Sequence, residues 1–315
     1  MASYLVTGGC GFIGSHLCDA LVAHGDTVRV LDDLSTGKRE QVPAAAELIV
    51  GDVGDRRVVG ACMDGMDGCF HLAAVASVER SINDWTGSHR TNLTGAVNVF
   101  DAARSCQGRP AARVVYASSA AVYGDTASAR LSETDLTRPL TPYGADKLGC
   151  EIQGRVAWLI HQVPNTGLRF FNVYGPRQDP SSPYSGVISI FADRLVHGNP
   201  VVIHGDGEQV RDFVYVKDVV RFLIAVMARD NTGAEIYNVC TGKSTSVREL
   251  AKVISVITGG GLKIRAMPAR LGDIRVSVGE PGKAWKGLLL RAETDLGAGL
   301  RDTIMNVAPV KRSAA

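Results

Sequence analysis

The residues that offer chemistry most directly are a tyrosine and a lysine four positions apart, Tyr143 and Lys147. Thr141 and Pro142 precede them and are typical of a helix N-cap and a first helical position, so we expect the pair on the first turns of a helix. Positions i and i+4 share one helix face, so the phenol and the ammonium can point at one small site. A nearby ammonium favours a phenolate, which is a base for an alcohol proton. On these five residues alone, an ordinary surface helix is the alternative interpretation.

A glycine-rich stretch near the N-terminus predicts a loop that binds a dinucleotide. Ser3 to Thr7 is a short apolar run typical of a strand, and a helical pattern extends to His24. The sequence TGGCGFIG lies between them, so a strand, a glycine loop and a helix follow one another. The free N–H groups and the positive end of the helix would meet a pyrophosphate. The predicted cofactor residues in this stretch are Gly8, Gly11, Phe12, Ile13 and Gly14.

Two aspartates end the next predicted strand, 27–31, and indicate which dinucleotide binds. Asp32 follows Gly14 by 18 residues, and a carboxylate there can accept hydrogen bonds from the adenosine ribose hydroxyls. The same carboxylate would repel a 2′-phosphate, so we predict NAD and not NADP. We interpret Lys38 and Arg39 as solvated loop charges. Further cofactor contacts are predicted at Asp33, Ser35, Thr36 and Gly37.

Short apolar runs continue to alternate with helical patterns, which predicts a parallel sheet with right-handed crossovers. Strands are expected over 47–50, 69–72, 113–117 and 166–171, with helices over 90–106 and from Tyr143 to about Ile160. Ligands bind at the carboxyl ends of such strands, where Ser119 lies. We interpret the isolated His71 as a core histidine. Cofactor contacts are predicted at Asp52, for which a plain turn aspartate is an equal explanation, and at Val53, Leu72, Ala73 and Ala74.

The pattern changes after about residue 171. A Pro-, Ser- and Gly-rich stretch over 176–186 predicts a loop over the site. We expect a Rossmann-type doubly wound parallel sheet in residues 1–171, completed by about 210–240, and a smaller α/β C-terminal substrate lobe in 172–305. Residues 306–315 are expected to form a disordered tail. In the second half, helices are predicted over 187–197, 217–228 and 247–258, strands over 201–203, 212–216 and 235–239, and a polar loop around 268–283.

Length and composition describe an ordinary globular protein. The chain has 315 residues, of which 45% are hydrophobic and 21% charged, and a net charge of +2, so nucleic-acid or membrane binding is not expected. No apolar run reaches the ~18 residues of a membrane helix, and no signal sequence is expected. Seven cysteines without a CxxC pair predict a reduced, cytoplasmic protein without a metal site.

Ten motifs in order give the chain a resemblance to the extended short-chain dehydrogenases/reductases, and more narrowly to the UDP-glucose 4-epimerase group. They cover about residues 3–302 and read TGGCGFIG, VLDDLSTGK, GDV, HLAAVASVERS, TNLTGAVNVF, YASSAAVYG, PYGADK, LRFFNVYGPRQ, GDGEQVRDFVYVKD and GDIRVS. The resemblance implies that Tyr143 is the catalytic tyrosine, with Lys147 and Ser119 as its partners. It also implies an Asn92 that positions groups beside the cofactor, and substrate contacts at Asn172, Val187, Arg211, Arg270, Asp273 and Ser277. Arg211 and Arg270 would grip the nucleotide diphosphate bidentately, and Asp273 the uridine ribose.

The implied activity is the reversible epimerisation of UDP-glucose and UDP-galactose at C4 through a 4-keto intermediate, with tightly held NAD. The dehydratases and decarboxylases that resemble this group carry acids after the catalytic hydroxyl, where this chain has Ala120 and Ala121. Ser277 takes a place often held by a bulky tyrosine, so UDP-GlcNAc and UDP-GalNAc are predicted substrates too; the alternative is a small loop residue whose space is filled by a neighbour. A UDP-glucuronate 4-epimerase, a dehydrogenase with net oxidation and a non-catalytic sensor are the alternatives.

The resemblance also implies a homodimer held by two helices from each copy. The helices concerned contain Asn92 and Tyr143. Apolar residues available for that contact are Val97, Phe100, Ile152, Val156 and Leu159, although burial against the sheet would explain some of them equally well.

Overall fold

The computed structural model describes residues 1–315 except 107, 127, 181–185, 230–232, 270–273 and 308–315. Its centre is a seven-stranded parallel sheet in the order β11-β6-β5-β4-β1-β2-β3, which confirms the predicted fold class. The chain order reverses between β1 and β4, so the crevice at their carboxyl ends is a topological switch point. The strands are β1 (Ser3–Thr7), β2 (Thr27–Asp32), β3 (Glu47–Val50), β4 (Gly68–His71), β5 (Arg113–Ser119), β6 (Asn165–Phe170) and β11 (Ala234–Val239).

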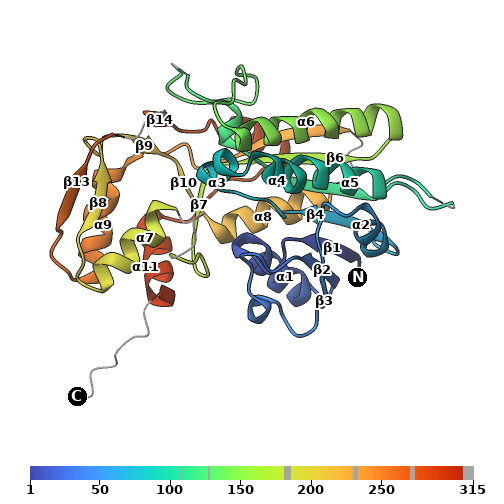
Figure 1. The fold of residues 1–315 in the computed structure, drawn as a ribbon, viewed down its shortest axis with the longest axis horizontal. Coiled ribbons are helices and arrows are strands. Elements are labelled where there is room, and N and C mark those ends of the chain that lie inside the picture. The colour runs from blue at the N-terminus through green and yellow to red at the C-terminus, as the bar shows by residue number, and fades with distance from the viewer. Residues whose placement is uncertain (107, 127, 181–185, 230–232, 270–273, 308–315) are drawn as a thin grey trace.

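Helices cover both faces of this sheet (Figure 1). On one face, α1 (Phe12–His24) and α8 (Val216–Met227) place Leu17 and Phe222 in a core shared with β1 and β4. On the other face, α2 (Arg56–Met63), α5 (Gly95–Ala102) and α6 (Pro142–His161) bury Val59, Val99 and Ala157 against the strands. Two-sided burial explains why the strands read as continuous apolar runs without alternation.

The helix predicted over 90–106 differs from the observed one. Helical structure begins before residue 90, because Asp84 caps α4 (Trp85–His89) by accepting a hydrogen bond from the Gly87 N–H. A π-helical turn, Arg90–Thr94, then leads into α5, which ends at Ala102. A short α3 (Val78–Asn83) precedes α4.

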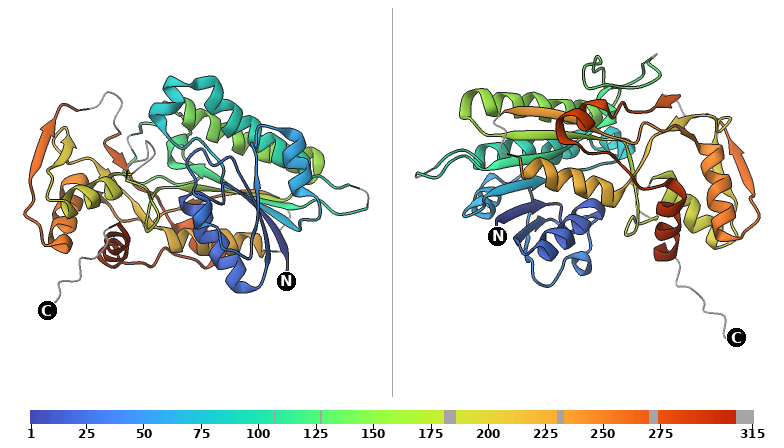
Figure 2. Two further views of the ribbon diagram at one scale, coloured as in Figure 1. Left: turned by 60° about the horizontal axis from the view of Figure 1, so that its bottom comes forward. Right: turned by 180° about the vertical axis from the view of Figure 1, so that it is seen from behind.

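A second lobe lies beside the carboxyl ends of the strands (Figure 2) and has its own apolar core. Phe191, Leu250 and Leu300 meet in that core from three helices. The lobe contains β7 (Asn172–Tyr174), α7 (Val187–Val196), β8 (Val201–His204), β9 (Val210–Arg211), β10 (Phe213–Tyr215), β12 (Thr245–Ser246), α9 (Val247–Thr258), β13 (Ile264–Met267), β14 (Val276–Ser277) and α11 (Leu296–Val307).

Two segments depart from the expected division of the chain. The predicted polar loop near 268–283 contains β14 and runs into α10 (Gly282–Leu288), which packs Ala284 into the core of the sheet domain and not of the lobe. The predicted tail starts too early, because α11 continues to Val307; residues 308–315 lie outside the described part of the chain.

Candidate active site

A cleft with a volume of about 470 Å³ opens at the carboxyl ends of β1, β4 and β5, at the switch point of the sheet. The amino-terminal end of α6 and the segment that follows β7 also contribute to its walls. Most of the predicted site residues meet here. Those that line the cleft are Gly8, Gly11, Phe12, Ile13, Gly14, Asp32, Asp33, Ser35, Thr36, Gly37, Val53, Leu72, Ala73, Ala74, Ser119, Tyr143, Lys147 and Asn172.

The glycine loop has the shape that a dinucleotide pyrophosphate requires. Gly8 adopts a left-handed φ of +72°, and a Cβ at Gly14 would lie 2.1 Å from the carbonyl oxygen of Gly8, so the loop and α1 can pack this closely only without side chains. The N-cap of α1 is Gly11, which offers no side chain, and the first turn has no acidic residue. The positive end of α1 is therefore left for an anionic ligand.

Asp32 is fixed at the end of β2, as predicted. Its carboxylate is 7% exposed and accepts hydrogen bonds from the backbone N–H groups of Cys10 and Leu34, each at 2.9 Å. Burial raises the pKa of Asp32, and the two backbone hydrogen bonds oppose that effect. A carboxylate can accept about four hydrogen bonds, so capacity remains for ribose hydroxyls in the cleft. Together with the glycine loop, these residues fit a dinucleotide that carries a free 2′-hydroxyl.

The predicted catalytic groups converge on the cleft from two elements. Thr141 caps α6 by accepting a hydrogen bond from the Gly144 N–H at 3.1 Å, as its sequence position predicted. Lys147 is 2% exposed and its Nζ lies 5.9 Å from the centre of the Tyr143 ring. Ser119 ends β5, and its Oγ accepts a hydrogen bond from the Ala121 N–H at 3.1 Å. A phenol, a cation and a hydroxyl thus share one wall.

His71 belongs to the core, as predicted. Its Nδ1 lies 2.8 Å from Thr7 Oγ1, and it does not line the cleft. Burial, together with the positive charge of Lys147, lowers the pKa of His71 to about 3. The imidazole is therefore neutral at physiological pH and cannot relay a proton as an imidazolium.

Two predicted cofactor residues do not reach the cleft. Asn92 is fully buried, and its side-chain amide forms two hydrogen bonds with the backbone of Val75. Its Oδ1 accepts from the Val75 N–H at 2.8 Å, and its Nδ2 donates to the Val75 carbonyl at 3.3 Å. It therefore shapes a cleft wall indirectly, through Val75. Asp52 accepts a hydrogen bond from Gly54 and pairs with Arg90 at 2.8 Å, which matches the plain turn aspartate.

The remaining predicted substrate residues that the structure describes lie farther into the lobe. Arg211 on β9 and Ser277 on β14 are register partners, so residues 66 positions apart in sequence sit side by side. Asp212 joins them to the cleft, because its N–H donates to the Ser277 carbonyl and its carbonyl accepts from the backbone and side chain of Asn172. Val187 opens α7 and packs at the edge of the lobe core. Arg270 and Asp273 lie outside the described residues.

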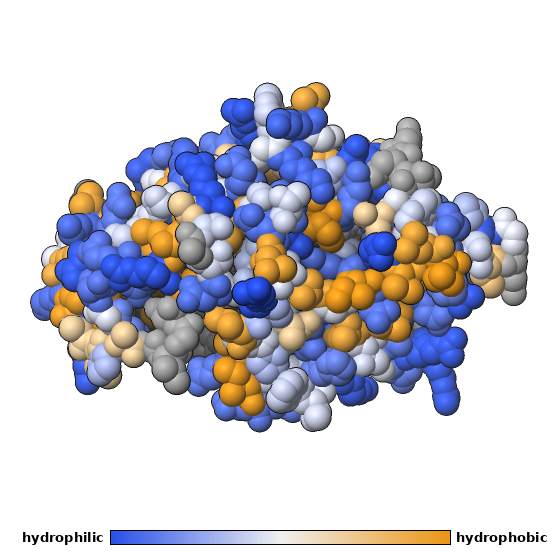
Figure 3. Space-filling view, turned by 90° about the horizontal axis from the view of Figure 1, so that it is seen from above, coloured by the Kyte–Doolittle hydropathy of each residue, from blue (hydrophilic) through white to orange (hydrophobic). Residues whose placement is uncertain are grey.

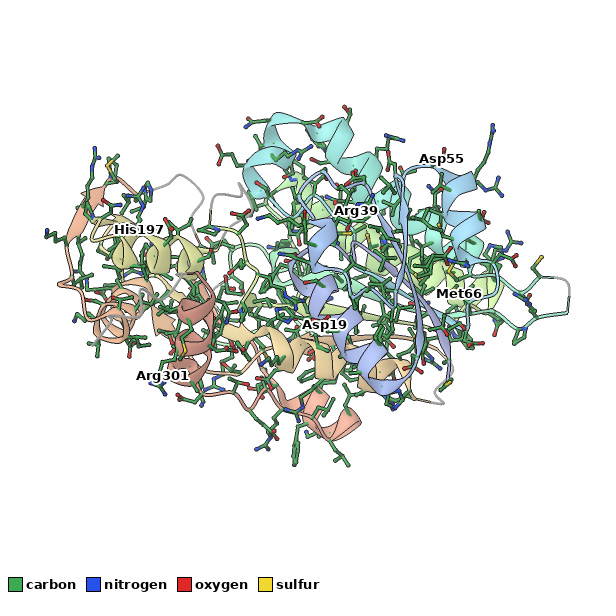
Figure 4. The ribbon with its side chains drawn as sticks, turned by 90° about the horizontal axis from the view of Figure 1, so that it is seen from below. Asp19, Arg39, Asp55, Met66, His197 and Arg301 are labelled. Carbon is green, nitrogen blue, oxygen red and sulfur yellow. The ribbon has the colours of Figure 1, made fainter. Side chains whose placement is uncertain are left out.

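Several residues at the site had not been assigned a role from sequence. Ser81 Oγ accepts a hydrogen bond from the Tyr143 N–H at 3.2 Å, and Arg80 lines the cleft beside it. The segment after β7 contributes to the lining of the cleft, where Asp179 pairs with Lys38 at 3.0 Å, so Lys38 is not merely a solvated charge. In the same segment after β7, Arg177 pairs with Asp19 of α1; Asp19 is labelled in Figure 4. The Pro- and Gly-rich composition predicted this loop but not its ion pairs.

The sequence predicts neither a metal site nor a membrane-spanning helix. Within the described part of the chain, no group of three or more His, Cys, Asp or Glu is placed to hold a metal ion. None of the described helices is long and apolar enough to cross a bilayer. All seven cysteines are unpaired, and Cys106 is the exposed one.

Comparisons with known proteins agree on the family and include more than one activity. A model of the NAD dependent epimerase/dehydratase family matches residues 4–240. A UDP-glucose 4-epimerase of Mycolicibacterium smegmatis is 36% identical over 307 residues, which cover 95% of this chain and 96% of that protein. A decarboxylase of UDP-N-acetyl-alpha-D-glucosaminuronate from Bacillus cytotoxicus is 32% identical and spans 84% of this chain and 83% of that protein.

Solved structures extend the similarity to the whole fold. The UDP-glucose 4-epimerase of Thermotoga maritima with UDP-glucose superimposes with a TM-score of 0.92 at 34% identity, covering 96% of this chain and 98% of that one. A UDP-N-acetylglucosamine 4-epimerase of Methanobrevibacter ruminantium, in complex with UDP-N-acetylmuramic acid, has a TM-score of 0.90 at 33% identity and covers 97% of each chain.

Proposed function

Because the chain belongs to the NAD dependent epimerase/dehydratase family, with NAD as its cofactor, we propose that it is a nucleotide-sugar 4-epimerase. The observation that carries the proposal is the convergence of Tyr143, Lys147 and Ser119 on the cleft that also holds the glycine loop and Asp32. Proton removal and dinucleotide binding thus take place in one site, which is what reversible oxidation of an alcohol requires.

The chain's own residues supply proton transfer and positioning. Tyr143, as the phenolate, takes the proton from the sugar 4-hydroxyl, and Lys147 stabilises that phenolate by its charge. Ser119 donates a hydrogen bond to the reacting oxygen and holds it in place while the proton is transferred. The bound cofactor supplies the hydride acceptor and donor of the reversible oxidation. After the 4-keto sugar has rotated to present the opposite face of C4, Tyr143 returns the proton to the C4 oxygen, while the diphosphate stays held in the lobe.

The residues after Ser119 favour epimerisation over elimination or decarboxylation. Ala120 and Ala121 form a short 3₁₀ turn, and neither can act as an acid or base. The acidic residues among the described lining of the cleft are Asp32, Asp33 and Asp179, of which the first two belong to the cofactor segment. Dehydration needs a general acid and a general base beside the sugar, and the end of β5 supplies neither.

The proposed substrate class is argued from residues of the second lobe. Arg211, placed beside Ser277, offers a guanidinium to a diphosphate, and Arg270 and Asp273 are proposed to complete the nucleotide contacts. We propose UDP-glucose and UDP-galactose as substrates, with UDP-GlcNAc and UDP-GalNAc also accepted because Ser277 is small. UDP-glucuronate is the alternative sugar. A cytoplasmic location and a role in galactose metabolism stay predictions.

The test is a panel of UDP-, dTDP- and GDP-sugars with product analysis, for the wild type and Tyr143→Phe. We expect epimerisation of UDP-hexoses by the wild type, and a kcat lower by roughly 10³-fold in the variant, because the general base is lost. Bound NAD should be retained in Tyr143→Phe, which shows that its cleft is intact. Epimerisation at the wild-type rate in this variant contradicts the proposed mechanism.

The same panel separates the other classes of function. A non-catalytic sensor would show neither product nor a reduced-nicotinamide absorbance when a nucleotide sugar is added. A dehydrogenase with net oxidation would accumulate NADH in proportion to product, whereas an epimerase shows at most a transient signal.

The proposed role of Ser277 gives a second prediction. In Ser277→Tyr the larger side chain occupies the space proposed for the C2 N-acetyl group, so we expect turnover of UDP-GlcNAc to fall at least tenfold more than turnover of UDP-glucose, since a steric clash discriminates by about 1–3 kcal/mol. Ser277→Ala, which keeps the space, is the matched control. Equal losses on both sugars in Ser277→Tyr would show that this residue does not set substrate size.

A further inference from the structure

A buried polar cluster lies directly behind the catalytic serine. Glu151 is 8% exposed and forms a two-point ion pair with Arg169 of β6, through Nε to Oε1 at 2.9 Å and Nη2 to Oε2 at 2.7 Å. Its Oε1 accepts a further hydrogen bond from Ser118 Oγ at 2.5 Å. Ser118 is 1% exposed and immediately precedes Ser119. The cluster therefore connects α6, β5 and β6 at the wall of the cleft.

Glu151 continues a stripe of chemical groups along α6. Tyr143, Lys147 and Glu151 are spaced four residues apart, so they follow one another on the same side of the helix. The first two line the cleft, and the third reaches the strand that carries Ser119. One rigid helix thus holds the base and its cation directly and holds the serine strand through a hydrogen bond.

The hydrogen bond from Ser118 to Glu151 is additional to the ion pair. Arg169 already occupies both oxygens of Glu151, and its guanidinium also lies 4.8 Å from the Tyr123 ring centre. A carboxylate can accept about four hydrogen bonds, so Ser118 occupies an acceptor site of Glu151 that Arg169 leaves open. This bond also ties the last residues of β5 to α6, at the point where the strand leaves the sheet for the 3₁₀ turn at Ala120.

We propose that Glu151 is a positioning residue that fixes the Ser119 hydroxyl relative to Tyr143 by holding Ser118. The proposal rests on the proposed function, in which Ser119 acts on the reacting oxygen. A hydroxyl that is misplaced by a fraction of an ångström costs rate and not substrate affinity, because its hydrogen bond is made to the transition state.

The variant that tests this is Ser118→Ala, which removes the tether and leaves the ion pair of Glu151 and Arg169 complete. On the substrates that the wild type epimerises, we expect the kcat of Ser118→Ala to be about tenfold lower and the KM unchanged, as for a mispositioned catalytic group. In Ser119→Ala the target of the tether is absent. Adding Ser118→Ala to that variant should therefore lower kcat no further.

Ser255→Ala is the matched control, because Ser255 is also a buried serine, 7% exposed, whose hydroxyl donates to one acceptor, the Gly260 carbonyl, in the other lobe. Its kcat should equal that of the wild type. The proposal is overturned by a kcat within twofold of wild type in Ser118→Ala, or by losses that multiply in the double variant, since multiplication means that the two serines act independently.

Crystal structures of the NAD-bound wild type and Ser118→Ala provide a readout that needs no turnover. We expect Ser119 Oγ to leave its hydrogen bond with the Ala121 N–H, seen at 3.1 Å. A Ser119 hydroxyl unmoved within coordinate error overturns the proposal, whichever sugars react. Absence of epimerisation by the wild type would instead refute the proposed function, so the two failures are distinguishable.

Discussion

His71 lies at the carboxyl end of β4, where burial and the charge of Lys147 lower its pKa to about 3, whereas in the unfolded chain the ordinary value is 6.5. Between these two values the unfolded state binds a proton that the folded state does not. The free energy of unfolding therefore falls as the pH decreases from about 6.5 towards 3, and this contribution is fully present above 6.5.

We predict that His71→Gln flattens this dependence. Through His71 alone, the wild type should lose about 2 kcal/mol of unfolding free energy between pH 7.5 and pH 5. Urea unfolding at the two pH values measures the loss in both proteins. An unchanged slope in His71→Gln would mean that folding does not lower the pKa of His71.

The glycine loop and α1 act together at the scale of an element. Because Gly14 stands within the first turn of α1 and a Cβ there would overlap the Gly8 carbonyl oxygen, the loop and the helix can only keep their spacing with glycine. The same contact aligns the positive end of α1 with the cleft. Packing and cofactor binding therefore depend on one position.

Gly14→Ala should consequently lose bound NAD and with it activity, because the loop must move by more than an ångström to admit the methyl group. The NAD content of purified protein measures this. Gly60→Ala is the control within another helix, α2, where a new Cβ meets nothing within 4 Å. That variant should retain NAD and gain about 0.5–1 kcal/mol in stability. Full NAD occupancy in Gly14→Ala would contradict the role given to this contact.

At the scale of the whole molecule, apolar side chains remain on the outer face of α5 and α6. Ile152 is 56% exposed and Leu159 52%, with Val97 and Val156 partly exposed near them, whereas Phe100 is buried in the core. Figure 3, which views the molecule from above, shows apolar side chains gathered in a band on this face. A band of this kind on a globular protein is what the homodimer implied by the sequence resemblance would need.

We predict that Ile152→Glu shifts the protein from dimer to monomer. The carboxylate would be buried without a partner in the interface, which costs several kcal/mol. Sedimentation velocity over a range of concentrations measures the change in mass. Val256→Glu, on α9 in the other lobe and 81% exposed, should leave the mass unchanged. A monomeric wild type, or a dimeric Ile152→Glu, would show that this face does not hold the dimer.

The sequence by itself determined the features whose causes are local. The glycine loop, the acid at the end of β2 and the capped start of α6 each lie within a few residues, so their chemistry could be recognised before any packing was known. The alternating elements predicted the parallel sheet for the same reason. The structure brings Tyr143, Lys147, Ser119 and the glycine loop together in one cleft.

Tertiary structure alone decided what depends on contacts between distant segments. The Asn92 side chain accepts a hydrogen bond from the backbone of Val75, and the Ser81 hydroxyl accepts one from the backbone of Tyr143. Nothing in the local sequence of either residue requires these hydrogen bonds. The two-residue strands β9 and β14 exist only because they pair, and that pairing places Arg211 beside Ser277. Hydrogen bonds across the chain need both partners brought together by the folded core, and no spacing along the sequence encodes that.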